Sequence, residues 1–137
     1  MDQTSKERLT MEPRLYIVMR EDLWDMNPGK GMAQAAHAQA DFDTYAENRY
    51  TDDAFRSAHI QWCEDRNFGV TLVLSATLDQ MHEIRTRINH SDITVDPTYP
   101  YRNWYGKVFT REEPTCMWAF VYSDEDVEYM REFKLHS

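Results

Sequence analysis

Basic residues are scarce in this sequence. There are 15 Lys and Arg against 24 Asp and Glu, so the net charge is -9 at pH 7. Because phosphate contacts need Lys and Arg, this balance argues against a general nucleic-acid binder and leaves room only for a local basic patch. Cysteine is almost as rare. Cys63 and Cys116 are the only two, which favours free thiols in a cytosolic protein over a disulfide or a metal pair.

Long apolar runs are also lacking. No stretch approaches the roughly 18 residues of a membrane span, and the N-terminus, MDQTSKERLTMEPR, has no apolar core for a signal peptide. We therefore expect a cytoplasmic protein without a membrane partner. Metal motifs of the HExxH or CxxC type are missing and the five His are scattered, so the sequence predicts neither a metal nor another cofactor.

Phosphate-loop motifs fail as well. In the segment NPGKGMAQAAHAQADF, Gly29-Lys30 is followed by Gly31 where a Walker A loop needs Ser or Thr, and a dinucleotide fingerprint lacks its third glycine. What remains is a glycine-flanked lysine at the start of a helix. Such a lysine either faces an anionic group near the helix N-terminus or is simply solvated, and spacing does not decide between the two.

The composition is that of a folded protein, with 137 residues, 42% apolar and 13% aromatic. We expect a flexible lead-in over residues 1–13 and one domain over 14–137. Patterning predicts the following elements along the domain: a strand at 14–19, helices at 30–49 and 51–66, a strand at 70–76, a helix at 77–88, a strand at 92–96, an irregular segment at 97–114, a strand at 115–122 and a helix after Ser123. This alternation predicts an α/β class, single-domain three-layer sandwich, in which a mixed four-stranded sheet carries helices on both faces.

The helix from Lys30 has two distinguishable faces. Three alanines, Ala33, Ala36 and Ala40, recur at helical spacing and predict the face that packs on the sheet. A polar stripe follows steps of four, three and four, and consists of Lys30, Gln34, His37 and Asp41.

Asp96 and the segment after it are the other candidates for function. Asp96 ends a short strand, where it serves either chemistry or the capping of the turn at Pro97. Aromatic and basic residues then alternate without an acid: Tyr99, Tyr101, Arg102, Trp104, Tyr105, Lys107, Phe109 and Arg111. Stacking planes beside cations suit unpaired nucleotides, and the alternative is a loop that packs its aromatics on the sheet or on a partner subunit.

Two motifs together resemble a known family. RLYIVMREDL, a short loop and GKGMAQAAHA are similar to the N-terminal signature of the archaeal and eukaryotic type of peptidyl-tRNA hydrolase, the Pth2 family. The signature positions are filled by Arg20, Asp22, Leu23, Gly29, Lys30, Ala33, Gln34, His37 and Ala38. The later strands and helices resemble the family in their order, so the similarity covers about residues 14–135.

The resemblance implies a Pth2-like fold and hydrolysis, without metal, of the ester between a peptide and the 3′ ribose of tRNA. Lys30 would stabilise negative charge or hold a phosphate, Asp96 would orient Lys30 or activate a water, and Thr115 would offer a hydroxyl. Further substrate contacts are expected from Gln34, His37, Thr98, Arg20, Arg102 and Lys107, with a structural hydrogen bond as the alternative for His37.

The sequence departs from the family pattern after Asp96. It reads Pro97-Thr98-Tyr99-Pro100 where the family has Ala-Gly-x-Thr, and the interval to Thr115 is longer. Two hypotheses follow: an esterase acting on peptidyl-tRNA or a related RNA or nucleotide ester, or a Pth2-like module that binds nucleotide, RNA or protein without turnover. A Lys30–Asp96 approach with a hydroxyl nearby would favour the enzyme, and a pocket filled by Tyr99 or Trp104 the binder. Either is compatible with a homodimer.

Overall fold

The computed structural model describes residues 12–23, 26–64 and 69–136, so nearly all of the predicted lead-in lies outside the described residues. The elements follow in the order β1 (Arg14–Arg20), α2 (Pro28–Glu47), α3 (Asp53–Glu64), β2 (Val70–Ala76), α4 (Leu78–Arg87), β3 (Ser91–Arg102), β4 (Val108–Val121) and α5 (Asp124–Met130). This order agrees with the prediction, and most ends differ from it by one to three residues.

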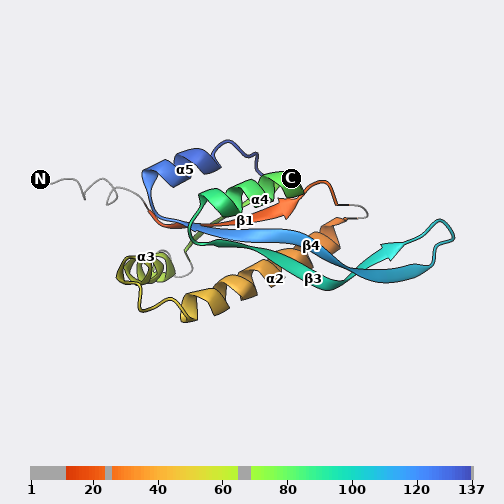
Figure 1. Ribbon diagram of the computed structural model, residues 1–137, viewed down its shortest axis with the longest axis horizontal. Helices are drawn as coiled ribbons and strands as arrows, with labels where there is room; N and C mark the ends of the chain where they lie inside the picture. The colour runs from red at the N-terminus through yellow and green to blue at the C-terminus, as the bar shows by residue number, and fades with distance from the viewer. Residues whose placement is uncertain (1–11, 24–25, 65–68, 137) are drawn as a thin grey trace, which may run out of the picture.

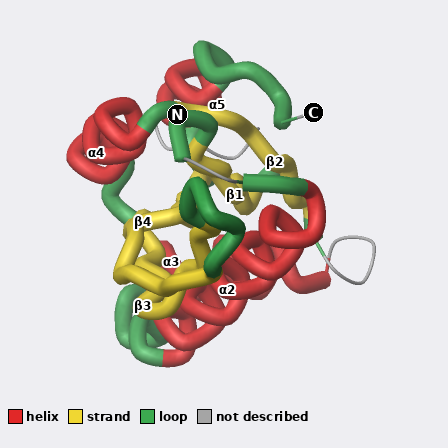
Figure 2. The backbone as a smooth tube through the Cα atoms, turned by 90° about the vertical axis from the view of Figure 1, so that its right-hand side faces the viewer, coloured by secondary structure: helices red, strands yellow, loops and turns green. Residues whose placement is uncertain are grey.

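The four strands form one mixed sheet. They lie in the order β2-β1-β4-β3, with β1 parallel to β2 and β4 antiparallel to both β1 and β3. Helices α2 and α3 cover one face of the sheet, and α4 and α5 cover the other (Figures 1 and 2). The predicted three-layer α/β sandwich is confirmed.

Each face of the sheet has its own core, because successive side chains of a strand point to opposite sides. Leu15, Ile17 and Met19 of β1 pack toward α2 and α3, in a cluster that includes Phe42 and Trp118. The alternate residues of β1 belong to the cluster under α4 and α5, which includes Tyr16, Val18, Met81, Ile84, Val127 and Met130. Both faces are covered, which explains why the central strands read as continuous apolar runs.

Helix α2 starts at a side-chain cap. Asn27 Oδ1 accepts a hydrogen bond from Lys30 N at 2.9 Å, and Pro28 occupies the first turn, where its missing N–H costs nothing. The same arrangement recurs on the other side of the sheet. Thr77 and Gln80 form a capping box at α4, and Ser123 caps α5.

The predicted packing face of α2 is wrong. Ala33, Ala36 and Ala40 are exposed, and the buried face consists of Gly31, Gln34, Ala38, Phe42 and Ala46. A phenylalanine removes far more apolar surface from water than an alanine, so Phe42 sets the rotation of the helix about its axis. That rotation turns Gln34 of the polar stripe inward.

The prediction of an irregular segment at 97–114 is also wrong. Strands β3 and β4 continue as a paired hairpin from Tyr99↔Arg111 to Arg102↔Val108, closed by a turn in which Gly106 has φ 80°. The prolines suggested a loop. However, β3 is an edge strand, where a missing N–H need not break the ladder, and Pro97 falls within a register shift between Asp96 and Tyr99. The hairpin projects beyond the layers of the sandwich (Figure 1). No helix in the described part of the chain is long and apolar enough to cross a membrane.

Candidate active site

Helix α2 is joined to edge strand β3 by three polar side-chain contacts, spread over three turns of the helix. The hydrogen bonds run from Lys30 Nζ to Pro100 O at 2.9 Å, from Gln34 Nε2 to Asp96 Oδ2 at 2.8 Å, and from Thr94 Oγ1 to Asp41 Oδ2 at 2.8 Å. The polar stripe predicted on this helix therefore faces the strand that carries the predicted catalytic aspartate.

Gln34 is the centre of this contact. It is 3% exposed, and its side-chain oxygen accepts a hydrogen bond from Thr115 Oγ1 at 2.7 Å while its amide nitrogen donates to Asp96. His37 Nδ1 lies 3.3 Å from the same oxygen, one turn further along the helix toward solvent. Gln34 thus links residues of α2, β3 and β4.

Asp96 is buried, and both of its carboxylate oxygens accept hydrogen bonds from protein groups. Its Oδ1 accepts hydrogen bonds from Thr98 N at 2.9 Å and Thr98 Oγ1 at 3.4 Å, and its Oδ2 accepts from Gln34. Burial by itself would raise the pKa of Asp96, but the hydrogen bonds from Thr98 and Gln34, with His37 nearby, together hold that pKa below its ordinary value. The carboxyl group is therefore ionised at neutral pH.

Lys30 occupies the first turn of α2, where its side chain crosses to β3. Its ammonium nitrogen lies 5.1 Å from the ring centroid of Tyr99 and donates to Pro100 O. Tyr99 is fully buried and packs with Leu23 and Tyr101, so its ring offers the ammonium group a fixed contact. The helix N-terminus adds a partial positive charge at the same place.

A match to a known family covers most of the chain, including these residues. The family model described as Peptidyl-tRNA hydrolase PTH2 matches residues 13–130, which covers β1 through α5. The chain belongs to the PTH2 family. No curated protein matches the sequence. The family is one of hydrolases that act in translation, and its match spans all nine predicted site residues.

Six of those nine residues meet at the α2–β3 contact of this PTH2-family chain. Gln34, Asp96 and Thr115 form its buried layer, while Lys30, His37 and Thr98 lie nearer to solvent. Tyr99 and Trp104, which the sequence offered as residues that could fill the site, lie in different places. Trp104 is 98% exposed on the hairpin, away from this contact, and Tyr99 lies beneath Lys30.

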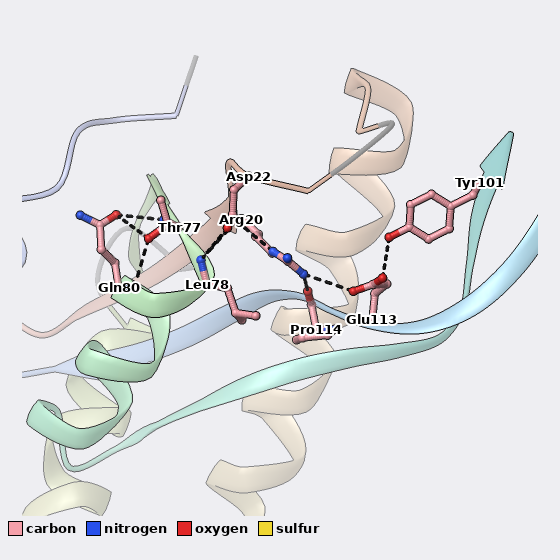
Figure 3. A network of polar contacts seen from close by, with 8 residues as sticks. All are labelled: Arg20, Asp22, Thr77, Leu78, Gln80, Tyr101, Glu113 and Pro114. Atoms are coloured by element: carbon pink, nitrogen blue, oxygen red, sulfur yellow. Dashed lines mark hydrogen bonds and ion pairs between the residues drawn. The ribbon is translucent and has the colours of Figure 1, made fainter. Parts of the chain in front are cut away.

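Arg20 belongs to a separate network on the PTH2 scaffold (Figure 3). Its guanidinium donates to Asp22 Oδ1 at 2.9 Å, to Glu113 Oε1 at 3.3 Å and to Pro114 O at 3.0 Å. Glu113 Oε2 in turn accepts a hydrogen bond from Tyr101 Oη at 2.6 Å. Burial, followed by the hydrogen bond and charge of Glu113, raises the pKa of Tyr101 to about 12. The network ties β1 to the base of the hairpin.

Arg102 and Lys107 lie on the hairpin, and they belong neither to the α2–β3 contact nor to the Arg20 network. Arg102 Nη1 donates to Gly106 O at 3.0 Å, and both side chains are exposed. Sequence reasoning missed Glu113 altogether, because an acid two residues before Thr115 looks like an ordinary surface charge until strand pairing brings it beside Arg20.

An apolar hollow of about 610 Å³ adjoins the start of α2 in this PTH2 chain. Its lining includes Asn27 and Gly31 from the start of α2, Val73 of β2, and the three methionines Met19, Met26 and Met32. Methionine side chains adapt to irregular apolar groups. The hollow lies toward β1 and β2, however, whereas Lys30 and Gln34 point to β3, so it is separate from the candidate site.

Proposed function

We propose that this protein hydrolyses the ester that joins a peptide to the 3′ ribose of tRNA, without a metal ion. One observation carries the proposal in a chain of the PTH2 family. Lys30 is held at a helix start against Pro100 of β3, one helical turn before Gln34, whose side chain links Asp96 and Thr115. The reaction consumes one water, breaks the bond between the carbonyl carbon and the ribose oxygen, and returns a proton to that oxygen.

Lys30 is the residue that meets the developing charge. Attack on an ester places negative charge on the carbonyl oxygen, and a fixed cation near it lowers the barrier. The side chain of Lys30 is positioned by Tyr99 and Pro100 O, and the N-terminus of α2 reinforces its field. Membership of the family supports the same assignment.

Asp96 and Thr98 are suited to holding the attacking water. Thr98 is exposed, and its hydroxyl lies 3.4 Å from Asp96 Oδ1, so a water can bridge these two oxygens. Because the pKa of Asp96 is lowered, its carboxylate is a weak base. We therefore propose that Asp96 orients the water and Gln34, and that it does not keep a proton from the water.

Thr115 acts through Gln34 in this proposal. Its hydroxyl is fully buried and donates to Gln34 Oε1, which leaves the amide nitrogen of Gln34 directed at Asp96. Thr115 is thus a positioning residue. His37, near the same oxygen and facing solvent, is assigned a contact to the substrate.

A binding module without turnover is the second candidate, and the turn after Asp96 favours it. A register shift at this point places Pro97 and Thr98 where the family pattern has a glycine-containing turn, and the Lys30 ammonium donates to Pro100 O. A substrate carbonyl would have to compete with that contact.

A release assay on purified peptidyl-tRNA separates the two candidates. Lys30→Ala should lower the rate of peptide release about 100-fold or more, with an unchanged free energy of unfolding. The exposed Lys134→Ala serves as the matched control and should leave the rate as in the wild type. Equal release by wild type and Lys30→Ala would refute the assignment of Lys30. Binding of the same tRNA by a wild type that releases nothing would favour the binding module.

A further inference from the structure

The hairpin formed by residues 99–111 exposes large aromatic side chains. Trp104 is 98% exposed and Tyr105 93%, both in the turn that closes the hairpin, and Val108 and Phe109 are half exposed beside them. Figure 1 shows that this turn projects beyond the helices. Contiguous apolar surface of this kind marks a binding surface.

The same hairpin is the basic part of an acidic protein. Arg102, Lys107 and Arg111 lie on it, and no Asp or Glu occurs from Pro97 to Arg111, whereas the whole chain has a net charge of -9. An anionic ligand that approaches this protein is therefore repelled by most of the surface and attracted here.

One face of the hairpin is concave. A hollow of about 430 Å³ is lined by Tyr101, Arg102, Asn103, Trp104, Phe109 and Arg111. The rings of Tyr101 and Phe109 are stacked, with centroids 5.5 Å apart and planes at 20°, and the Arg111 guanidinium lies 5.6 Å from the Tyr101 centroid. Aromatic rings with guanidinium groups close to them are what unpaired nucleic-acid bases and their phosphates require.

The hairpin is also held in place before any ligand arrives. Glu113 connects Tyr101 at its base to Arg20 of β1 (Figure 3). In the turn, Asn103 Oδ1 accepts hydrogen bonds from Tyr105 N at 2.9 Å and Lys107 N at 3.0 Å. A surface that is ordered in advance loses less entropy when it binds.

We propose that this hairpin binds unpaired RNA nucleotides, with bases stacked on Trp104 and Phe109 and phosphates paired with Arg102 and Lys107. If the proposed function holds, the RNA bound by the hairpin is the unpaired 3′ end of the tRNA. From Asp96 the strand continues for six residues to Arg102, about 20 Å at 3.3 Å per residue, before the turn that carries Trp104. The terminal ester would lie at Lys30 while the preceding nucleotides follow the hairpin.

RNA is favoured over a protein partner by charge. A second copy that docked hairpin to hairpin would set its own Arg102, Lys107 and Arg111 against the same three cations, whereas RNA brings phosphates together with its bases. The test therefore measures both RNA binding and self-association.

The test uses a labelled single-stranded oligouridine RNA and the full chain, followed by fluorescence anisotropy. Trp104→Ala should weaken binding about tenfold, the loss expected for one stacked base. The double variant Arg102→Gln with Lys107→Gln should reduce the slope of log affinity against log salt by about 1.4, or 0.7 for each phosphate contact. Matched controls are Leu135→Ala, another exposed apolar residue, and Arg56→Gln with Arg131→Gln, which removes two cations elsewhere.

Hydrolysis of peptidyl-tRNA separates this inference from the proposed function. If both hold, the hairpin variants raise KM about tenfold and preserve kcat, whereas Lys30→Ala keeps its affinity for the oligouridine RNA. Binding that depends on Trp104 in a protein that releases no peptide would support the hairpin and reject the hydrolase. Equal RNA affinity in hairpin variants and controls, or a wild-type dimer that Trp104→Ala dissociates while RNA fails to bind, would overturn the hairpin proposal.

Discussion

Gln34 Nε2 donates to Asp96 Oδ2 at 2.8 Å, joining a buried amide of α2 to a buried carboxylate of β3 across 62 positions of sequence. The other end of the same amide accepts from Thr115. A carboxylate that receives hydrogen bonds on both oxygens keeps its charge inside the protein. The candidate active site therefore depends on Gln34 as much as on the charged residues around it.

Replacing Gln34 by leucine should be strongly destabilising. The substitution conserves volume but removes the hydrogen bond to the buried Asp96 Oδ2 and leaves the Thr115 hydroxyl only its long contact to Cys116 Sγ at 3.7 Å, which should cost about 2–3 kcal/mol in the free energy of unfolding. Urea denaturation at neutral pH measures the change. Gln39→Leu is the matched control on the same helix, since the Gln39 amide reaches only Asp43 at the surface, and it should change stability by less than about 0.5 kcal/mol. Similar losses in the two variants would contradict the central role of Gln34.

Asp96 should make stability fall in acid. Its pKa is lower in the folded protein than in the unfolded chain, so the unfolded state binds more protons as the solution is acidified. The stabilisation is complete above the unfolded pKa, about 3.8, and is lost as pH decreases through the folded pKa. Denaturation series on wild type and Asp96→Asn should therefore differ most at neutral pH and converge in acid. Asp53→Asn, on an exposed residue, should run parallel to the wild type at every pH.

The fold was largely predictable because its apolar patterns are local. Strand Val70–Ala76 and the caps Thr77 and Ser123 each depend on a few neighbouring residues, and all three agree with the structure. The hairpin was not predictable in the same way. Its strand character comes from pairing between residues such as Tyr99 and Arg111, and an edge position is a property of the sheet order, which prolines in the sequence do not reveal.

The candidate site was predictable in part. The helical period of α2 placed Lys30, Gln34 and His37 on one stripe, and Asp96 was recognised at a strand end. The inward turn of Gln34 could not be read from the period, since it follows from the burial of Phe42 on the same helix. The contact of Glu113 with Arg20 depends on long-range strand pairing, and nothing local signals it.

His90 should make stability rise with pH near neutrality. Burial lowers its pKa, Arg49 acts in the same direction, and Asp52, at 3.9 Å from Nε2, opposes them. Its ring is held between the hydroxyl groups of Tyr45 and Tyr122. Because the unfolded chain takes up the proton first, stability is complete well above pH 6.5 and declines as pH falls below it.

Urea denaturation between neutral and mildly acidic pH tests this expectation. The slope of stability against pH should be smaller in His90→Gln than in the wild type, with a remainder from His59, whose pKa burial also lowers. His82→Gln, on the exposed side of α4, should retain the wild-type slope. An unchanged slope in His90→Gln would show that His90 titrates alike in both states.

The Tyr101–Glu113 hydrogen bond should show strong energetic coupling, because it joins the hairpin to Arg20 in a partly buried position at 2.6 Å. A double-mutant cycle of Tyr101→Phe and Glu113→Ala should give a coupling energy of about 1.5–2 kcal/mol, as expected for a hydrogen bond to a charged group. Tyr129 and Glu83 form the same pair at the surface at 3.4 Å, and their cycle should give less than about 0.5 kcal/mol. Equal coupling in the two cycles would mean that Glu113 does not hold the hairpin, and the order of its RNA-binding face would then have to come from the turn alone.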